Sequence, residues 1–161
     1  MQVKKGTKLK KEVLISIKGV QTVEDSQDVT ELFTQGLFYK KNDNYYVCYD
    51  ESETTGFGGC KTTLKIEKNN RLTLIRAGEI RSHLIIELGQ RNVGHYGVPG
   101  GDVMVGVYTK DYLNNLNDDG GDLYFKYSMD INSSLISDNE VFINVHQLNE
   151  EKEGKVKNEL N

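Results

Sequence analysis

The stretch TTGFGGCKTTLKIE, residues 54–67, combines glycines, a lysine and threonines in the manner of a phosphate-binding loop. Such a loop requires the pattern G-x-x-x-x-G-K-[ST] between a strand and a helix. When the pattern is aligned on Lys61, its two glycine positions fall on Thr55 and Cys60, whose side chains would keep the backbone away from a phosphate. The residues after Lys61 alternate between polar and apolar, which is typical of a strand. The stretch therefore predicts a glycine-containing loop that leads into a β-strand, and not a nucleotide site.

The same period-two alternation recurs along most of the chain, and short runs rich in Gly, Asn or Asp separate the alternating segments. The clearest segment is LYFKYSMDI, residues 123–131. One apolar and one polar face on each strand indicates an antiparallel sheet. We therefore predict an all-β protein of about nine or ten strands, closed into an antiparallel up-and-down barrel because a long meander otherwise leaves exposed edges. Residues 110–118 are expected to hold a helical turn.

The bulk composition indicates one ordinary globular domain. The chain has 161 residues, of which 37% are hydrophobic and 27% charged, and its net charge is −4. This charge argues against nucleic acid or an anionic membrane as a partner. Sixteen of the 20 basic residues are lysines, which suit a solvated surface better than a phosphate site. We predict a single domain with a folded part at about 12–148 and a polar, dispensable tail at 149–161.

The sequence also predicts a cytoplasmic protein. The longest apolar part near the N-terminus, residues 13–17, is too short for a membrane span or a signal-peptide core. Two cysteines, Cys48 and Cys60, do not form a disulfide framework and are compatible with a reducing compartment. We expect these two thiols to remain unpaired. The sequence does not indicate an oligomeric state.

One segment approaches a calcium-binding loop. In NLNDDGGD, Asn115, Asn117, Asp119 and Gly120 have the spacing of the first half of such a loop. The bidentate glutamate that should complete the loop falls on Lys126, and a strand follows where a helix is required. We therefore interpret the segment as a turn with turn-forming side chains.

No other group of residues predicts catalysis or metal binding. His83, His95 and His146 lie on three different predicted strands, and their spacing does not require them to meet. No serine or cysteine occupies a nucleophile elbow. We therefore predict no metal, no cofactor and no catalytic residue.

Four segments follow one another in a distinctive order: ETTGFGGCKTTLKIE (53–67), LTLIRAG (72–78), a hairpin at Pro99–Gly101, and GGDLYFKYSMDIN (120–132). This combination resembles the YwiB-like family of small uncharacterised bacterial proteins, over about residues 13–145. The resemblance implies a calycin-like (lipocalin-like) β-barrel and brings no established activity, so no catalytic residue can be transferred. Gly100 departs from the family, which tends to carry an aromatic residue there.

The pairing of strands can be predicted around residues 45–76. A loop at 54–59 would place Glu51 opposite Thr62 and Tyr49 opposite Leu64, with all four side chains on the interior face. The next turn is best closed by three residues, 68–70, because a two-residue turn would send Leu72 and Leu74 outward. Arg76 then lies opposite Thr62, inside the barrel. The sequence thus predicts a buried charged pair, Glu51 and Arg76, near one end of an apolar interior.

These residues support three hypotheses for function. The first is a non-enzymatic module that binds a small, partly apolar molecule through Glu51, Thr62, Arg76 and Tyr49, with Arg76 as anchor for an anionic group. The second is a structural or interaction protein whose barrel is filled by its own side chains and in which the charged pair holds the strands together. The third is a weak hydrolase or isomerase that uses Glu51 as a base. A cavity inside the barrel would separate the first from the second.

Overall fold

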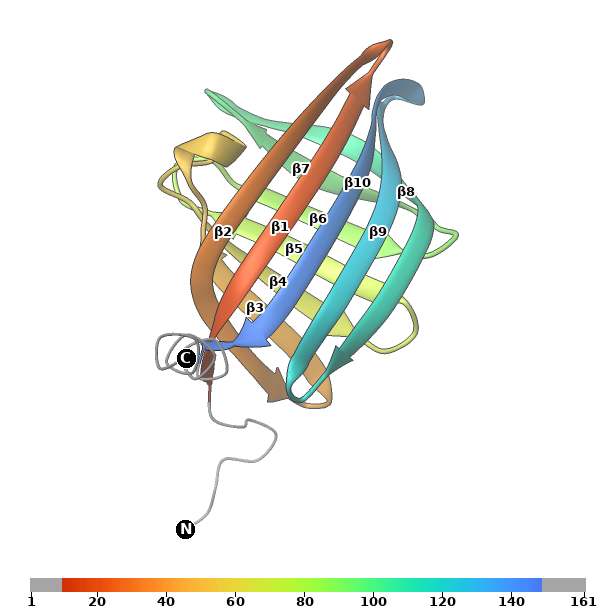
Figure 1. Cartoon of the computed structure of the whole chain (residues 1–161). Helices are drawn as coiled ribbons and strands as arrows, with labels where there is room; N and C mark the ends of the chain where they lie inside the picture. The colour runs from red at the N-terminus through yellow and green to blue at the C-terminus, as the bar shows by residue number, and fades with distance from the viewer. Residues whose placement is uncertain (1–9, 149–161) are drawn as a thin grey trace.

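The computed structural model describes residues 10–148, which form ten strands and one 3-10 turn (Figure 1). The strands are β1 (Lys11–Val23), β2 (Ser26–Lys41), β3 (Asn44–Asp50), β4 (Lys61–Glu67), β5 (Arg71–Ala77), β6 (Ser82–Glu87), β7 (Arg91–Val98), β8 (Gly101–Asn117), β9 (Gly120–Ile131) and β10 (Ser134–Gln147). The 3-10 turn, η1 (Glu53–Thr55), lies between β3 and β4. The predicted tail, 149–161, lies outside the described residues.

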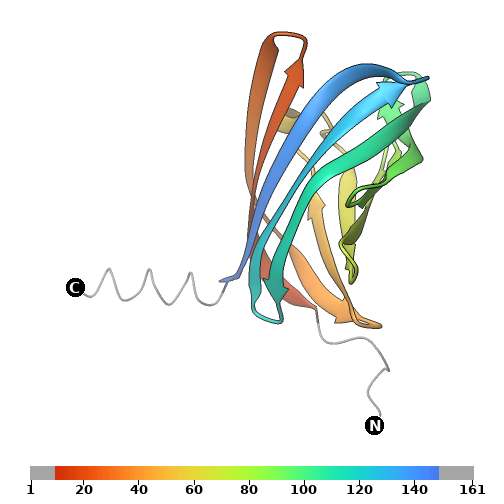
Figure 2. The same ribbon diagram turned by 90° about the vertical axis from the view of Figure 1, so that its right-hand side faces the viewer.

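Every strand pairs antiparallel with its neighbours in the chain, and β1 pairs with β10 to close the sheet (Figure 2). The prediction of a closed up-and-down barrel is therefore confirmed. Closure leaves no free sheet edge, which removes the backbone groups that would otherwise recruit another strand. Among residues 10–148, no helix is long and apolar enough to cross a membrane.

Several turns follow directly from local sequence. Asn42 and Asp43 between β2 and β3 adopt left-handed φ angles of 52° and 68°, as do Asn69 and Asn70 (68° and 57°) between β4 and β5. Asparagine and aspartate tolerate this region better than other non-glycine residues, so their clusters indicate turns. The turn at 24–25 between β1 and β2 lacks glycine and asparagine, and the alternation pattern did not predict it. The resulting hairpin projects beyond its neighbours (Figure 1).

The expected helical turn at 110–118 is wrong. Residues 110–117 continue β8, which is 17 residues long. A register shift between Thr109 and Asp111 inserts an extra residue opposite β9. Such a bulge interrupts the alternation of apolar side chains, and for this reason the sequence pattern did not predict a strand here.

The interior face of the sheet forms a continuous apolar core. Phe38 and Phe125 are 2% and 1% exposed. The other fully buried hydrophobic side chains are aliphatic and come from every strand except β2 and β7. Three of the buried polar side chains, Glu51, Thr62 and Arg76, lie together at the end of the barrel near η1. In Figure 1 that end lies opposite the one where β1 begins and β10 ends.

Candidate functional site

The pairing of β4 with β5 is the one that the sequence predicts. Leu72 lies opposite Ile66, Leu74 opposite Leu64, and Arg76 opposite Thr62. The three-residue loop at 68–70 is therefore confirmed, and Arg76 lies on the interior face with only 9% of its surface exposed.

The predicted pairing of β3 with β4 is wrong by two residues. Tyr49 lies opposite Thr62 rather than Leu64, and the Glu51 backbone N–H donates to the Cys60 carbonyl oxygen at 2.8 Å. The physical reason is the longer connection: η1 and its flanking residues take up 52–59. Because a shift of two residues preserves the face of every side chain, Tyr49, Glu51 and Thr62 still point inward.

Glu51, Thr62 and Arg76 form one buried hydrogen-bonded cluster. Arg76 Nη2 lies 3.3 Å from Glu51 Oε2, with side-chain exposures of 10% and 2%. Arg76 Nε donates to Thr62 Oγ1 at 3.3 Å, and the Thr62 hydroxyl donates to Glu51 Oε2. The Thr55 hydroxyl donates to Glu51 Oε1 at 2.8 Å. Glu51 is thus the acidic partner that was predicted for Arg76, and both of its oxygens accept hydrogen bonds.

The loop between β3 and β4 covers this cluster. The Ser52 side chain accepts from the Thr54 backbone N–H and caps η1, and Gly56 ends it with a φ of 87°. The centroid of the Phe57 ring then lies 3.8 Å from the guanidinium carbon of Arg76, and the ring is edge-on to Tyr96, with ring centroids 6.2 Å apart. A guanidinium over an aromatic face is held by the ring quadrupole. Phe57 therefore closes the mouth of the barrel above Arg76.

Beneath the cluster, the core leaves a cavity of about 150 Å³. Aliphatic and aromatic side chains make up most of its wall, which is contributed by strands from around the barrel: Ile17, Gly19, Thr30, Tyr49, Glu51, Thr55, Phe57, Leu64, Leu74, Arg76, Leu84, Ile86, Phe125, Tyr127, Val141 and Ile143. The interior is thus largely filled by side chains but retains a pocket under the mouth.

Tyrosine hydroxyls add further polarity to the site. Burial raises the pKa of Tyr49 far above the ordinary value of 10.0, and the neighbouring Glu51 carboxylate adds to this effect. Burial also raises the pKa values of Tyr127 and Tyr96, while the positive charge of Arg76 opposes the increase in both. These phenols therefore remain neutral hydrogen-bonding groups at physiological pH.

Other residues considered from the sequence lie away from this site. Asn115 and Asn117 are on β8, and the Asn117 side chain accepts from the Asp119 backbone N–H at 2.8 Å, as expected for a turn. Cys48 and Cys60 are both free, as predicted. Within residues 10–148, no three His, Cys, Asp or Glu side chains are grouped so as to hold a metal ion.

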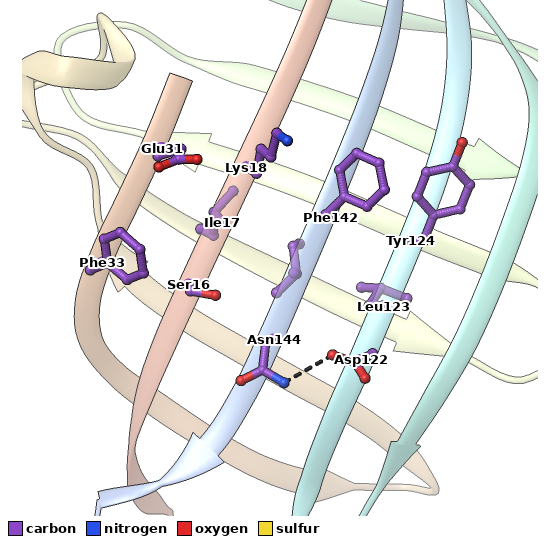
Figure 3. Close-up of a pocket in the computed structure, with 11 residues that line it drawn as sticks. Ser16, Ile17, Lys18, Glu31, Phe33, Asp122, Leu123, Tyr124, Phe142 and Asn144 are labelled. Atoms are coloured by element: carbon purple, nitrogen blue, oxygen red, sulfur yellow. Dashed lines mark hydrogen bonds between the residues drawn. The ribbon is translucent and has the colours of Figure 1, made fainter. Parts of the chain in front are cut away.

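A second hollow lies on the outside of the barrel, over β2, β1, β10 and β9 (Figure 3). Its volume is about 360 Å³, and an adjoining hollow near Leu14 and Gln35 measures about 530 Å³. Phe33 borders both and is 78% exposed. The Asn144 amide donates to Asp122 across the floor at 2.9 Å. Because this surface is open and its polar groups do not converge, we regard the interior cavity as the better candidate site.

Sequence reasoning missed Thr55, Phe57 and Tyr127 as members of the site. Of these three, only Phe57 could have been suspected from the sequence, since it is an aromatic residue in a loop between glycines. Tyr127 was identified only as one of the interior residues of an alternating strand. Nothing in the local sequence distinguishes a tyrosine that lines a cavity from one that fills the core.

The geometry defines a class of small, closed antiparallel barrels with a largely filled interior, a buried polar cluster at one mouth and a small cavity beneath it. Within this class, the chain belongs to the family described as domain of unknown function DUF1934, whose model matches residues 15–143. The uncharacterized beta-barrel protein YwiB of Bacillus subtilis (strain 168) is 25% identical over 125 residues, which cover 76% of this chain and 86% of YwiB.

A solved structure supports the fold. The crystal structure of the Bacillus subtilis ywiB protein superposes with a TM-score of 0.76, covering 88% of this chain and 95% of the other. The sequence identity in that superposition is 19%, so the likeness concerns the fold alone. The resemblance to the YwiB-like family and the predicted barrel are thereby confirmed.

Proposed function

We propose that the protein is a non-enzymatic module that binds a small, partly apolar molecule in the cavity beneath Arg76. The observation that carries this proposal is the coincidence of the apolar cavity with the buried cluster of Glu51, Thr62 and Arg76 at its upper end. Ligand sites typically combine apolar walls with a few convergent polar groups. A purely structural pair would not need an adjoining space.

The volume of the cavity limits the size of the ligand. A cavity of about 150 Å³ admits a molecule of roughly the size of benzene. Arg76 uses Nε and Nη2 for Thr62 and Glu51, and a guanidinium has five N–H donors, so donors remain for a ligand oxygen. The tyrosine phenols offer further hydrogen bonds. We therefore expect a compact ring or branched chain with one oxygen-containing head group directed towards Arg76.

The loop at 52–59 provides the entrance in this proposal. Gly56 and Gly59 on either side of Phe57 have φ angles of 87° and 85°, and a Cβ at either position would meet no neighbouring atom within 4 Å. The loop therefore has free space beside Gly56 and Gly59, whereas Gly58 between them lies against the Glu53 side chain. Movement of Phe57 away from Arg76 would open the cavity without disturbing the ladder of β3 and β4.

Nuclear magnetic resonance titration with benzyl alcohol and benzoate tests the proposal. We expect at least one of the two probes to shift the methyl resonances of Leu74 and Ile86, which line the cavity. Val141→Phe should abolish these shifts by filling the cavity, whereas the matched change Val29→Phe, at a position 53% exposed, should not. Equal shifts in both variants, or none in the unaltered protein, would contradict interior binding.

Two other functions, an interaction protein and an enzyme, can be weighed against this proposal. The small size of the cavity and the exposed Phe33 favour an interaction protein that acts through its surface, and a failed titration would support that function. A hydrolase or isomerase with Glu51 as base is disfavoured by the geometry. Thr55, Thr62 and Arg76 already occupy the carboxylate oxygens, so a substrate proton would have to displace one of them.

We place this function in the cytoplasm. The free thiols of Cys48 and Cys60 support a reducing compartment, because such thiols persist there without oxidation.

A further inference from the structure

The barrel brings together two of the three histidines on its outer face. His83 on β6 lies directly opposite His95 on β7, and His95 lies directly opposite Met104 on β8. All three residues are exposed. Directly opposed residues of antiparallel strands have Cβ atoms roughly 4.5–5.5 Å apart. An imidazole, a second imidazole and a thioether therefore stand side by side in one row across three strands.

A carboxylate stands beside the central histidine. His95 Nδ1 lies 3.8 Å from Asp102 Oδ2, and both groups are about half exposed (57% and 51%). Histidines that bind metals commonly direct their second ring nitrogen to a carboxylate, which fixes the ring and increases the basicity of the free nitrogen. In this arrangement Nε2 of His95 is directed away from Asp102 and is available to a ligand.

We propose that His83, His95 and Met104 form a binding site for copper. Imidazole suits both zinc and copper, whereas the soft thioether of methionine selects for Cu⁺. Because the sheet fixes the three backbone positions, only side-chain rotations are needed to bring the donors onto one ion. The two imidazoles and the thioether supply three donors to one ion.

The site is separate from the interior cavity and does not depend on the function proposed for it. His83, His95 and Met104 point outward, whereas the cavity is lined by side chains of the interior face, such as Leu84 on the same strand as His83. The two sites can therefore be tested independently.

Competition of the purified protein with the chromophoric chelator bicinchoninate for Cu⁺, in the presence of ascorbate, tests the proposal. We expect one bound ion per chain and a loss of affinity of about tenfold or more in both His83→Gln and His95→Gln. Met104→Leu should weaken binding of Cu⁺ but leave binding of Zn²⁺ unchanged. The matched control is His146→Gln, on β10 and remote from the row, which should bind as the unaltered protein does.

Each other outcome overturns the proposal. Unchanged Cu⁺ affinity in either His83→Gln or His95→Gln, or an equal loss in His146→Gln, would place copper elsewhere or make it adventitious. Equal losses for Cu⁺ and Zn²⁺ in Met104→Leu would remove the selectivity for copper. Since these side chains are exposed, the variants should keep the melting temperature of the unaltered protein without metal, which separates lost binding from lost folding.

Discussion

Two arginine–carboxylate pairs in this barrel show how little the geometry of an ion pair reveals about its importance. Arg91 and Asp130 form two hydrogen bonds, at 2.7 and 3.0 Å, with side-chain exposures of 44% and 14%. Arg76 and Glu51 make one direct contact at 3.3 Å, but their exposures are 10% and 2%. By distance alone, the outer pair has the stronger hydrogen bonds. By burial, the loss of one partner should lower stability more in the inner pair.

The two pairs should differ in their contribution to stability because, after one partner is removed, water can solvate the remaining charge in one case and not in the other. At the surface, water solvates the remaining charge, so an exposed pair contributes little to stability. In the interior, the remaining charge stays unpaired in a medium of low polarity, and the penalty is several kcal/mol. The inner pair also has Thr55 and Thr62 as hydrogen-bonding partners, which together satisfy the Glu51 carboxylate.

Arg76→Met should lower the free energy of unfolding by about 3 kcal/mol or more, because it leaves the Glu51 carboxylate buried without its cation. The double variant Glu51→Gln/Arg76→Met should recover much of that loss, since an amide can be buried at a lower penalty. Urea unfolding of both variants measures the effect. A single variant as stable as the unaltered protein would mean that water already reaches Glu51.

Stability should fall as the pH rises above about 10. Tyr49 has a folded-state pKa raised above the ordinary 10.0, first by burial and then by Glu51. Its contribution is therefore complete below pH 10 and is lost as the pH rises towards the folded value, because only the unfolded state releases the proton readily. Tyr49→Phe should make this alkaline slope shallower, and other buried tyrosines with raised pKa values, such as Tyr127, should account for the remainder. The control Tyr108→Phe, at a position 41% exposed, should leave it unchanged. An identical slope in Tyr49→Phe would show that Tyr49 does not contribute to it.

The outer pair predicts a weaker effect at the opposite end of the pH scale. The hydrogen bond from Arg91 holds the pKa of Asp130 below its ordinary value of 3.8. The contribution of this pair is therefore present above that pH and is lost as the pH falls through the folded value. Arg91→Met should change stability at neutral pH much less than Arg76→Met does, and added salt should reduce the difference further. A loss as large as that of Arg76→Met would invalidate the comparison based on burial.

The smallest effect is expected for the C-terminal tail. Residues 149–161 have no apolar alternation and can bury little surface, so a chain that ends after Asn149 should melt at nearly the temperature of the full chain. A large decrease in the melting temperature would mean that the tail contributes to the folded barrel.

The same regions show where prediction from sequence succeeds and where it stops. The register of β4 with β5 could be predicted because a slip of one residue would expose Leu72 and Leu74. The register of β3 with β4 could not, because a slip of two residues leaves Tyr49 and Glu51 on the same face. That choice depends on the conformation of a loop that contains η1 and two left-handed glycines.

The composition of the site was predictable to a similar extent. Alternation places Arg76 and Glu51 inside the barrel, and the cost of an unpaired buried charge requires them to meet. The position of Phe57 over Arg76 depends on the loop and not on any periodicity. The cavity depends on how well the interior side chains fill the barrel, which is a property of volumes in three dimensions.

The most direct test of the central claim, that the inner pair is an anchor for a ligand, is native mass spectrometry of the protein purified from its own host. The account predicts that the unaltered protein carries a small adduct, roughly the size of a substituted benzene. It also predicts that the folded double variant Glu51→Gln/Arg76→Met has lost this adduct. An unaltered protein without any adduct, or a double variant that retains it, would contradict the claim and leave the pair with a structural role alone.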